Sequence, residues 1–336
     1  MSIKFYAVAL CALLLLPASA YAGGFCCQLS TGTQEGFSSA GQISLRLDES
    51  YSRMDRFQNG GSQVSLSSVL KDPRFAKMNG VVPDVMTMNR ITATVGYAPT
   101  DRLSLNVSVP YVINDMTMFM FMAGMWSWGP MEQIHDLGDV SVTGTYRIYQ
   151  DKDDHPTTAI NVGAGLKLPT GAISYTNSKK KRVHAHMQPG TGSWDPILLA
   201  SFTKMLSPSF MAQAGAHYEI ATANGYGYKF GDTAGVDAEL RYNVTDFMNV
   251  SLGVNYFHSE QADDPDNKYN GRDSKRLTDY SGYTGEDSLW VSPAVQIMPF
   301  SGASIDLKFQ YPAYYHVPDI EHVTSYRIVA GISYSF

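Results

Sequence analysis

The most regular feature of the sequence is an alternation of apolar and polar residues with a period of two. The stretch 236–244 carries apolar residues at its even positions and Asp, Glu, Arg or Asn at its odd positions, and the same division recurs at 103–109, 139–148 and 305–311. Successive side chains of a β-strand point to opposite faces, so this pattern predicts strands with one polar and one apolar face. Aromatic residues gather at the ends of these stretches, at Tyr97, Tyr111, Tyr149, Tyr242, Phe247, Tyr256 and Phe300. Aromatic girdles mark both interfaces of a transmembrane barrel, so the distribution favours a membrane barrel over a soluble sandwich.

The strands and their connections predict an all-β fold, a transmembrane antiparallel β-barrel of about twelve strands. Short turns at 98–101, 151–154, 207–209, 245–246 and 301–303 alternate with mostly longer loops, which places both chain termini on the periplasmic side. A short helix is expected near 67–70, and the uncertain stretch 54–85 leaves ten or fourteen strands open. The predicted strands are 43–53, 86–98, 103–117, 138–150, 157–172, 193–206, 210–222, 233–244, 247–259, 285–300, 304–317 and 321–336.

The N-terminus has the pattern of a secretory signal peptide. Lys4 is followed by an apolar run over 5–16 and by the small-residue cleavage site Ala20-Tyr21-Ala22. We therefore expect a signal peptide at 1–22, an N-terminal tail at 23–42 that lies in the periplasm or plugs the lumen, and a barrel at 43–336. The adjacent pair Cys26 and Cys27 could form a disulfide, bind a soft metal or bridge to another chain, and the sequence favours none of these.

The chain ends on an alternating strand whose last residue is Phe336. A terminal Phe in this setting resembles the signal by which the barrel assembly machinery recognises outer-membrane proteins. Together with the signal peptide, it predicts the bacterial outer membrane as the location. The basic run Lys179-Lys180-Lys181-Arg182 in a predicted outer loop would contact lipopolysaccharide phosphates.

The polar face of the predicted strands would line the lumen with charges of both signs. This composition fits either a hydrated network of paired charges or a polar constriction that selects solutes by charge and size. A narrow channel is expected, because small barrels are filled by side chains and only much larger ones are wide open. The predicted lumen residues are Arg46, Arg90, Arg147, Lys167, Glu219, Asp237, Glu239, Arg241, Asp306, Lys308 and Arg327, together with Asp48 and His217.

Methionines recur at every second position in one stretch, interleaved with aromatic residues between 114 and 135. Thioethers are soft ligands that suit Cu(I), so copper is the alternative to a barrel without a cofactor. The simpler interpretation is an adaptable apolar patch at the outer mouth, which would also suit capture of a small apolar or aromatic molecule. The candidate metal residues are Met116, Met118, Met120, Met122, His135, His184, His186 and Met187.

Composition and motifs exclude several other classes of function. The formal net charge of −6 argues against a nucleic-acid partner, which would select a basic face. An outer-membrane hydrolase would need a Ser activated by a His, but the adjacent His258 and Ser259 would point to opposite faces of a strand. The sequence therefore predicts no enzyme, and a structural or adhesive barrel remains open.

Several segments, taken in order, resemble the outer-membrane transporter family of the meta-pathway of phenol degradation. The resemblance covers most of residues 45–205 and implies a barrel that passes small solutes, hydrophobic or aromatic ones included. It implies no transferable set of binding residues. The segments are Tyr51-Ser52-Arg53-Met54-Asp55, Val69-Leu70, Tyr97-Ala98-Pro99-Thr100-Asp101-Arg102-Leu103, Val109-Pro110-Tyr111, Leu137-Gly138-Asp139-Val140, Leu166-Lys167-Leu168-Pro169-Thr170-Gly171 and Gly190-Thr191-Gly192-Ser193-Trp194-Asp195-Pro196.

Overall fold

A computed structural model describes residues 39–336 apart from 154–155, 177–179, 181, 265–275 and 278–279. The predicted signal peptide, most of the N-terminal tail, Cys26, Cys27, and Lys179 and Lys181 of the basic run lie outside the described residues.

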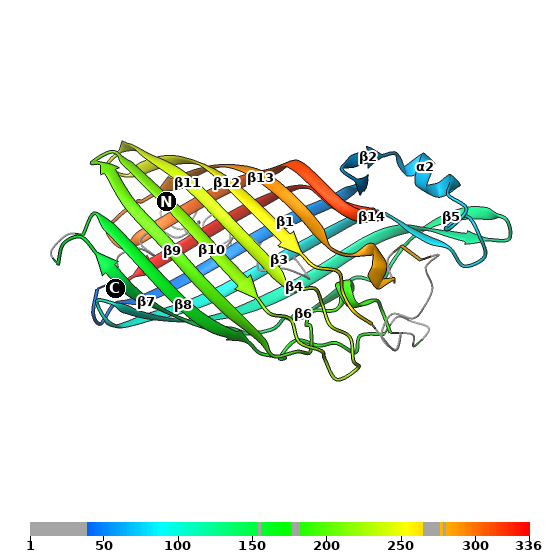
Figure 1. Ribbon diagram of the computed structural model, residues 1–336, viewed down its shortest axis with the longest axis horizontal. Helices are drawn as coiled ribbons and strands as arrows, with labels where there is room; N and C mark the ends of the chain where they lie inside the picture. Colours follow the sequence, from blue (N-terminus) through cyan, green and yellow to red (C-terminus); the bar gives the residue numbers. More distant parts are fainter. Residues whose placement is uncertain (1–38, 154–155, 177–179, 181, 265–275, 278–279) are drawn as a thin grey trace, which may run out of the picture.

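The described chain is almost entirely β-structure (Figure 1). The helical segments among the described residues are α2 (Leu66–Lys71), η1 (Ala185–Met187) and η2 (Ser281–Tyr283), and none of them has the length or apolarity to cross a membrane. The helix expected near 67–70 is α2. The strands are β1 (Ile43–Gly60), β2 (Ser62–Val64), β3 (Val81–Thr100), β4 (Leu103–Met122), β5 (Met125–Pro130), β6 (Ile134–Leu137), β7 (Ser141–Gln150), β8 (Thr158–Lys167), β9 (Asp195–Ser207), β10 (Phe210–Glu219), β11 (Thr233–Thr245), β12 (Met248–Ser259), β13 (Glu286–Ile297) and β14 (Ala303–Ser335).

Eleven of these strands form a closed antiparallel ring in which β14 pairs with β1. An odd number of strands cannot alternate in direction around a ring, so one of them must reverse. β14 does so near 317–321: its first half is antiparallel to β13 and its second half is antiparallel to β1. The two halves contact each other, with Ser304 Oγ 2.8 Å from Ser333 Oγ and the Ser335 amide bonded to the Gly302 carbonyl. The wall is therefore crossed twelve times, as the sequence predicts. β2, β5 and β6 extend the sheet beyond the ring.

Short turns and long loops lie at opposite ends of the barrel (Figure 1). The C-terminus lies at the end with the short turns, beside the first residues of β1: the Ile43 and Phe336 backbones exchange two hydrogen bonds. The opposite end carries α2, β2 and β5. This arrangement matches the predicted topology, with the long loops at the outer end.

The outer surface of the ring is apolar, as the alternation predicts. Exposed Leu, Ile, Val and Phe side chains from nearly every strand form the wall, and predicted girdle residues such as Tyr97, Tyr149 and Phe300 are about half exposed near the short turns. A barrel that is closed in backbone hydrogen bonds and apolar outside is a structure that can cross a lipid bilayer.

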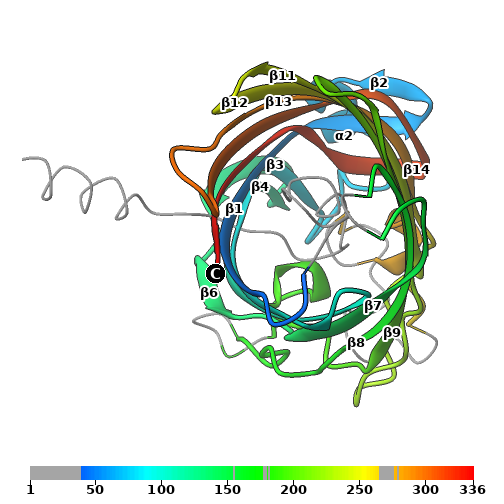
Figure 2. The ribbon, with the colours of Figure 1, turned by 90° about the vertical axis from the view of Figure 1, so that its left-hand side faces the viewer.

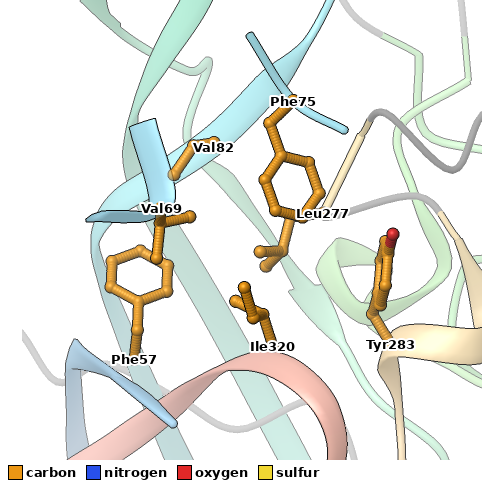
Figure 3. Packing of buried hydrophobic residues seen from close by; sticks show 7 residues of the cluster. All are labelled: Phe57, Val69, Phe75, Val82, Leu277, Tyr283 and Ile320. Carbon is orange, nitrogen blue, oxygen red and sulfur yellow. The ribbon is translucent and has the colours of Figure 1, made fainter. Parts of the chain in front are cut away.

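A compact apolar cluster lies at the end of the barrel that carries α2 (Figure 1), and Figure 3 shows its seven buried side chains. The helix α2, held at its start by the Ser65 side chain, contributes Val69, which packs with Phe57 of β1 and Val82 of β3. Phe75, Leu277, Tyr283 and Ile320 complete the cluster. Arg74 ties this region to β14, because its guanidinium lies 3.0 Å from Asp72 and 2.7 Å from Asp319.

The long β8–β9 connection folds back into the lumen (Figure 2). Its two ends are held by the buried carboxylate of Asp139, which accepts hydrogen bonds from the Gly171 amide at 2.9 Å and from the Thr191 amide and hydroxyl at 2.6 and 2.7 Å. The tip is tied to β4, where Asn114 Nδ2 donates to the Met187 carbonyl at 3.1 Å. We call residues 171–191 the inner loop.

Two glycines bring the ends of the inner loop into backbone contact. A Cβ atom added to Gly171 would lie 2.7 Å from Gly190 Cα, and one added to Gly190 would lie 2.5 Å from the Gly171 carbonyl oxygen. No side chain fits at either position without moving the backbone. The Gly138-Asp139, Thr170-Gly171 and Gly190-Thr191 segments of the family resemblance therefore build the anchor of the inner loop.

Replacing Asp139 by Ala is expected to release the inner loop while leaving the barrel closed. The change removes three hydrogen bonds to a buried carboxylate, each worth on the order of 1–3 kcal/mol. Hydrogen exchange of the described amides over 171–191 should accelerate at least tenfold. Asp151→Ala is the matched control, because Asp151 also accepts several hydrogen bonds but in the β7–β8 turn. Equal protection of the loop in wild type and Asp139→Ala would contradict the anchor.

Acidification is expected to weaken docking of the inner loop through His186. Burial, and to a smaller extent nearby His184, lowers the pKa of His186 to about 4. An undocked His has a pKa near 6.5, so its contribution to docking is complete above about pH 6.5 and is lost as the pH falls towards 4. Loop protection measured from pH 7 to 4, corrected for intrinsic exchange, should decline more steeply in wild type than in His186→Phe. Parallel pH profiles would contradict this role.

Candidate functional site

A cavity of about 210 Å³ lies in the outer half of the lumen, between the inner loop and the barrel wall. Its lining comes from the inward faces of β1, β3 and β4, from the inner loop, and from the outer ends of β10 to β14. The cavity is the natural candidate for a solute site, because ligand sites are concave, mostly apolar and carry a few polar groups.

Methionines form one wall of this cavity. Met54, Met86, Met88 and Met116 line it from β1, β3 and β4, and Met86 pairs directly with Met116 across the sheet. Behind them Met187 of the inner loop is fully buried, and Met118 and Met131 pack at the edge. We call these seven residues the methionine wall.

The structure brings together only part of the candidate metal set. Met116 and Met187 belong to the methionine wall, Met118 packs at its edge, and His184 and His186 line the cavity. Met120 and Met122 continue onto the β4–β5 hairpin, where Met122 is 52% exposed. His135 is exposed, with its Nδ1 2.9 Å from the Tyr111 hydroxyl. In the part of the chain that the structure describes, no group of three or more His, Cys, Asp or Glu could hold a metal.

Sequence reasoning overlooked Met54, Met86 and Met88. The signal was present, because Met86 and Met88 are separated by one residue and therefore share a strand face. Their position opposite Met116 follows from the β3–β4 register, which a single sequence does not reveal.

The opposite wall of the cavity is polar and aromatic. Glu260, Glu286, Glu321 and His322 line it together with Phe257 and Tyr283, which are buried. The sequence analysis singled out none of these six residues as a binding group. The cavity thus has an apolar sulfur-rich side and a side with hydrogen-bond acceptors.

An ion-pair cluster closes the cavity towards the periplasmic end. Lys167 Nζ lies 2.8 Å from Asp195 and 2.5 Å from Glu219, and both Lys167 and Glu219 line the cavity. Asp195 also accepts hydrogen bonds from Ser193 and from the Thr222 amide. Buried charges require such partners, and here the partners also fix the ends of the β8–β9 and β10–β11 connections.

Further polar clusters fill the lumen on the periplasmic side of the Lys167 cluster. Glu239 lies 3.0 Å from Arg241 and 3.1 Å from Lys308, which is 2% exposed. Arg46 lies 2.6 Å from Asp48 and 3.1 Å from Asp306.

The remaining predicted lumen residues also face inward. Arg327 donates to Ser52 at 3.0 Å and stacks on Trp290, Arg147 is buried beside Gln150, Arg90 lines the cavity, and Asp237 and His217 are buried. The structure thus places the predicted residues inside and joins most of them in pairs. Selection of solutes by charge and size remains a prediction.

The geometry of His258 and Ser259 does not form a hydrolytic pair. His258 Nδ1 lies 2.9 Å from Asp287 at a partly exposed site, and Ser259 lines the cavity on the inner side. A nucleophile and its base must lie within hydrogen-bond reach of each other. His258 and Ser259 are neighbours in β12, so their side chains point to opposite faces of the barrel wall.

One solved structure supports the fold. The COG4313 outer membrane channel from Pseudomonas putida F1 is similar, with a TM-score of 0.59 and 13% identity over 91% of this chain and 99% of that one. Two further structures match more weakly. A Pseudomonas aeruginosa FadL homologue gives a TM-score of 0.42 and 10% identity, covering 96% of this chain and 98% of that one. The P. putida toluene transporter TodX gives 0.43 and 8%, covering 89% and 90%.

Comparison of sequences gives the family. No curated protein is detectably similar to this chain in sequence. The family model described as "Putative MetA-pathway of phenol degradation" matches residues 55–297, which include most of the barrel, the inner loop and the cavity lining. The closed barrel with its apolar outer face has the architecture of a bacterial outer-membrane protein. The chain belongs to this phenol-degradation family of outer-membrane β-barrels.

Proposed function

We propose that the protein carries small apolar or aromatic solutes across the outer membrane. The observation that carries this proposal is the cavity under the outer mouth of a closed barrel, with a methionine wall on one side and polar groups on the other. A solute entering from outside would meet the cavity before it met the charged network below.

The chemistry of methionine supports an aromatic solute. The thioether side chain is flexible and polarisable, and its sulfur makes favourable contacts with aromatic rings. A wall of seven methionines can therefore adapt to rings of different size without a specific fit. The description of the family, phenol degradation, points to the same class of compound.

The polar network supports a narrow passage rather than a wide pore. Lys308, Glu239 and Arg241 are nearly fully buried and bonded to one another, so little free cross-section remains at their level. Such a passage would admit single small molecules and exclude bulky or strongly charged ones. We propose no catalytic activity and no resident cofactor for this barrel.

We also propose three partners at its surface. The apolar outer face would contact the lipid bilayer, and the exposed Lys180 of the basic run would contact lipopolysaccharide. Phe336, which is 62% exposed and bonded to Ile43 at the barrel seam, would be recognised by the barrel assembly machinery.

Uptake of radiolabelled phenol by cells that lack other porins tests the proposal. Cells producing the full chain should take up phenol faster than cells without it. Met86→Lys with Met88→Lys should reduce the protein-dependent rate at least tenfold, because burying charge in an apolar site is costly. Met122→Lys with Met125→Lys is the matched control on the exposed β4–β5 hairpin and should leave the rate unchanged. Equal uptake with and without the protein would contradict the function.

Copper transport is the second candidate, because the methionine wall concentrates soft ligands beside His184 and His186. If Cu(I) is the cargo, Leu at positions 86, 88 and 116 should abolish Cu(I) retention in equilibrium dialysis. Leu at positions 120, 122 and 125 should not. The first variant should still take up phenol, since Leu preserves the apolar wall. Retention that survives both triple substitutions would exclude the methionine wall as the copper site, and no retention by wild type would exclude copper as the cargo.

A further inference from the structure

Three acceptor groups converge on the polar wall of the cavity. Glu286 begins β13, and Glu321 and His322 follow the point where β14 reverses. Register shifts in β1 at Met54 and between Gln58 and Gly60 interrupt the normal alternation here, so that the neighbours Glu321 and His322 both line the cavity.

His322 presents an unused acceptor. Its side chain is 6% exposed, and its Nε2 atom is buried without a partner in the described part of the chain. The Nε2 atom of a neutral ring that donates from Nδ1 carries a lone pair, so it can only accept a hydrogen bond.

The two glutamates have few partners in the described part of the chain. Glu286 accepts one hydrogen bond from Ser288 at 3.0 Å, and Oε2 of Glu321 is buried without a partner. Neither carboxyl group forms an ion pair with any residue that the structure describes. A buried carboxylate without a cation is costly, so the site favours a ligand that supplies one.

Two arginines close to this wall are committed to other groups. The guanidinium of Arg327 bonds Ser52 and Gln310 and lies 4.9 Å over the ring of Trp290, and Arg74 is held between Asp72 and Asp319. The cavity lining also contains Arg90 and Lys167, the latter paired with Asp195 and Glu219, and the rings of Phe257 and Tyr283, whose faces attract cations.

We propose that Glu286, Glu321 and His322 bind the ammonium group of a small apolar amine, whose hydrocarbon body lies against the methionine wall. This inference rests on the proposed transport function and names the head group of its cargo. A primary ammonium has three N–H donors for the three acceptors, and its charge balances the carboxylates. A carboxylate in the same place would meet like charge.

Titration of the purified full chain with 2-phenylethylamine, 2-phenylethanol and phenylacetate tests the inference. The three probes share one apolar body and differ in head group. We expect the amine to bind at least tenfold more tightly than the alcohol and phenylacetate to show no binding. Glu286→Gln with Glu321→Gln should weaken amine binding at least tenfold and leave alcohol binding within about twofold, because a charge-assisted bond is the stronger one.

Two further variants make the result decisive. His322→Phe removes one acceptor without adding charge and should weaken amine binding even where the double variant folds poorly. Glu49→Gln is the matched control, since Glu49 lies on the outward face of β1 in line with Leu45 and Leu47.

Amine affinity that is unchanged in both cavity variants, or phenylacetate binding as tightly as the amine, would overturn the inference. If wild-type cells take up phenol but the purified protein shows no preference for the amine, the inference is overturned and the transport proposal still stands. Absence of any uptake would refute transport itself.

Discussion

The structure depends on one constraint: a backbone that crosses hydrocarbon must satisfy every hydrogen bond within the protein. The pairing of β14 with β1 meets it by closing the sheet, and it joins residues nearly three hundred positions apart. Antiparallel closure needs an even number of crossings, so the chain reverses within β14. Closure also sorts the side chains: the apolar set faces lipid, and the polar set is confined to a lumen where each charge needs a partner. The ion pairs of Lys167, Glu239 and Arg46 follow from that confinement.

Much of the fold could be predicted because the information is local. The period-two pattern gives each strand and its inward face, so the alternation alone assigns residues such as Asp306, Lys308 and Arg327 to the lumen. The two predicted strands 304–317 and 321–336 match the two halves of β14. The turn residues at 207–209 and 301–303 mark where the strands on either side of each turn end and begin. These features need only a few neighbouring residues to specify them.

The site was harder to predict because it is assembled from distant segments. Met86 and Met116 meet through the β3–β4 register, and Met187 joins them only because the inner loop folds inward on Asp139. The same loop separates His184 and His186 from His135, which stays outside with Tyr111. Glu321 and His322 reach the cavity through irregularities in β1, where alternation fails as a guide. The sequence pattern drew attention to Met116, Met118 and Met187 but overlooked Met54, Met86 and Met88, which meet them through the β1–β3–β4 pairing and the inner loop.

The contact between Gly171 and Gly190 has a consequence for how a solute could pass. With its two ends locked backbone to backbone, the inner loop acts as a fixed baffle across the lumen, and swinging it aside would break Asp139's bonds at both ends. The methionines of the wall are buried or partly buried, but their thioether side chains are flexible and polarisable. The barrel therefore combines an anchored loop with an adaptable lining that can fit molecules of different outline.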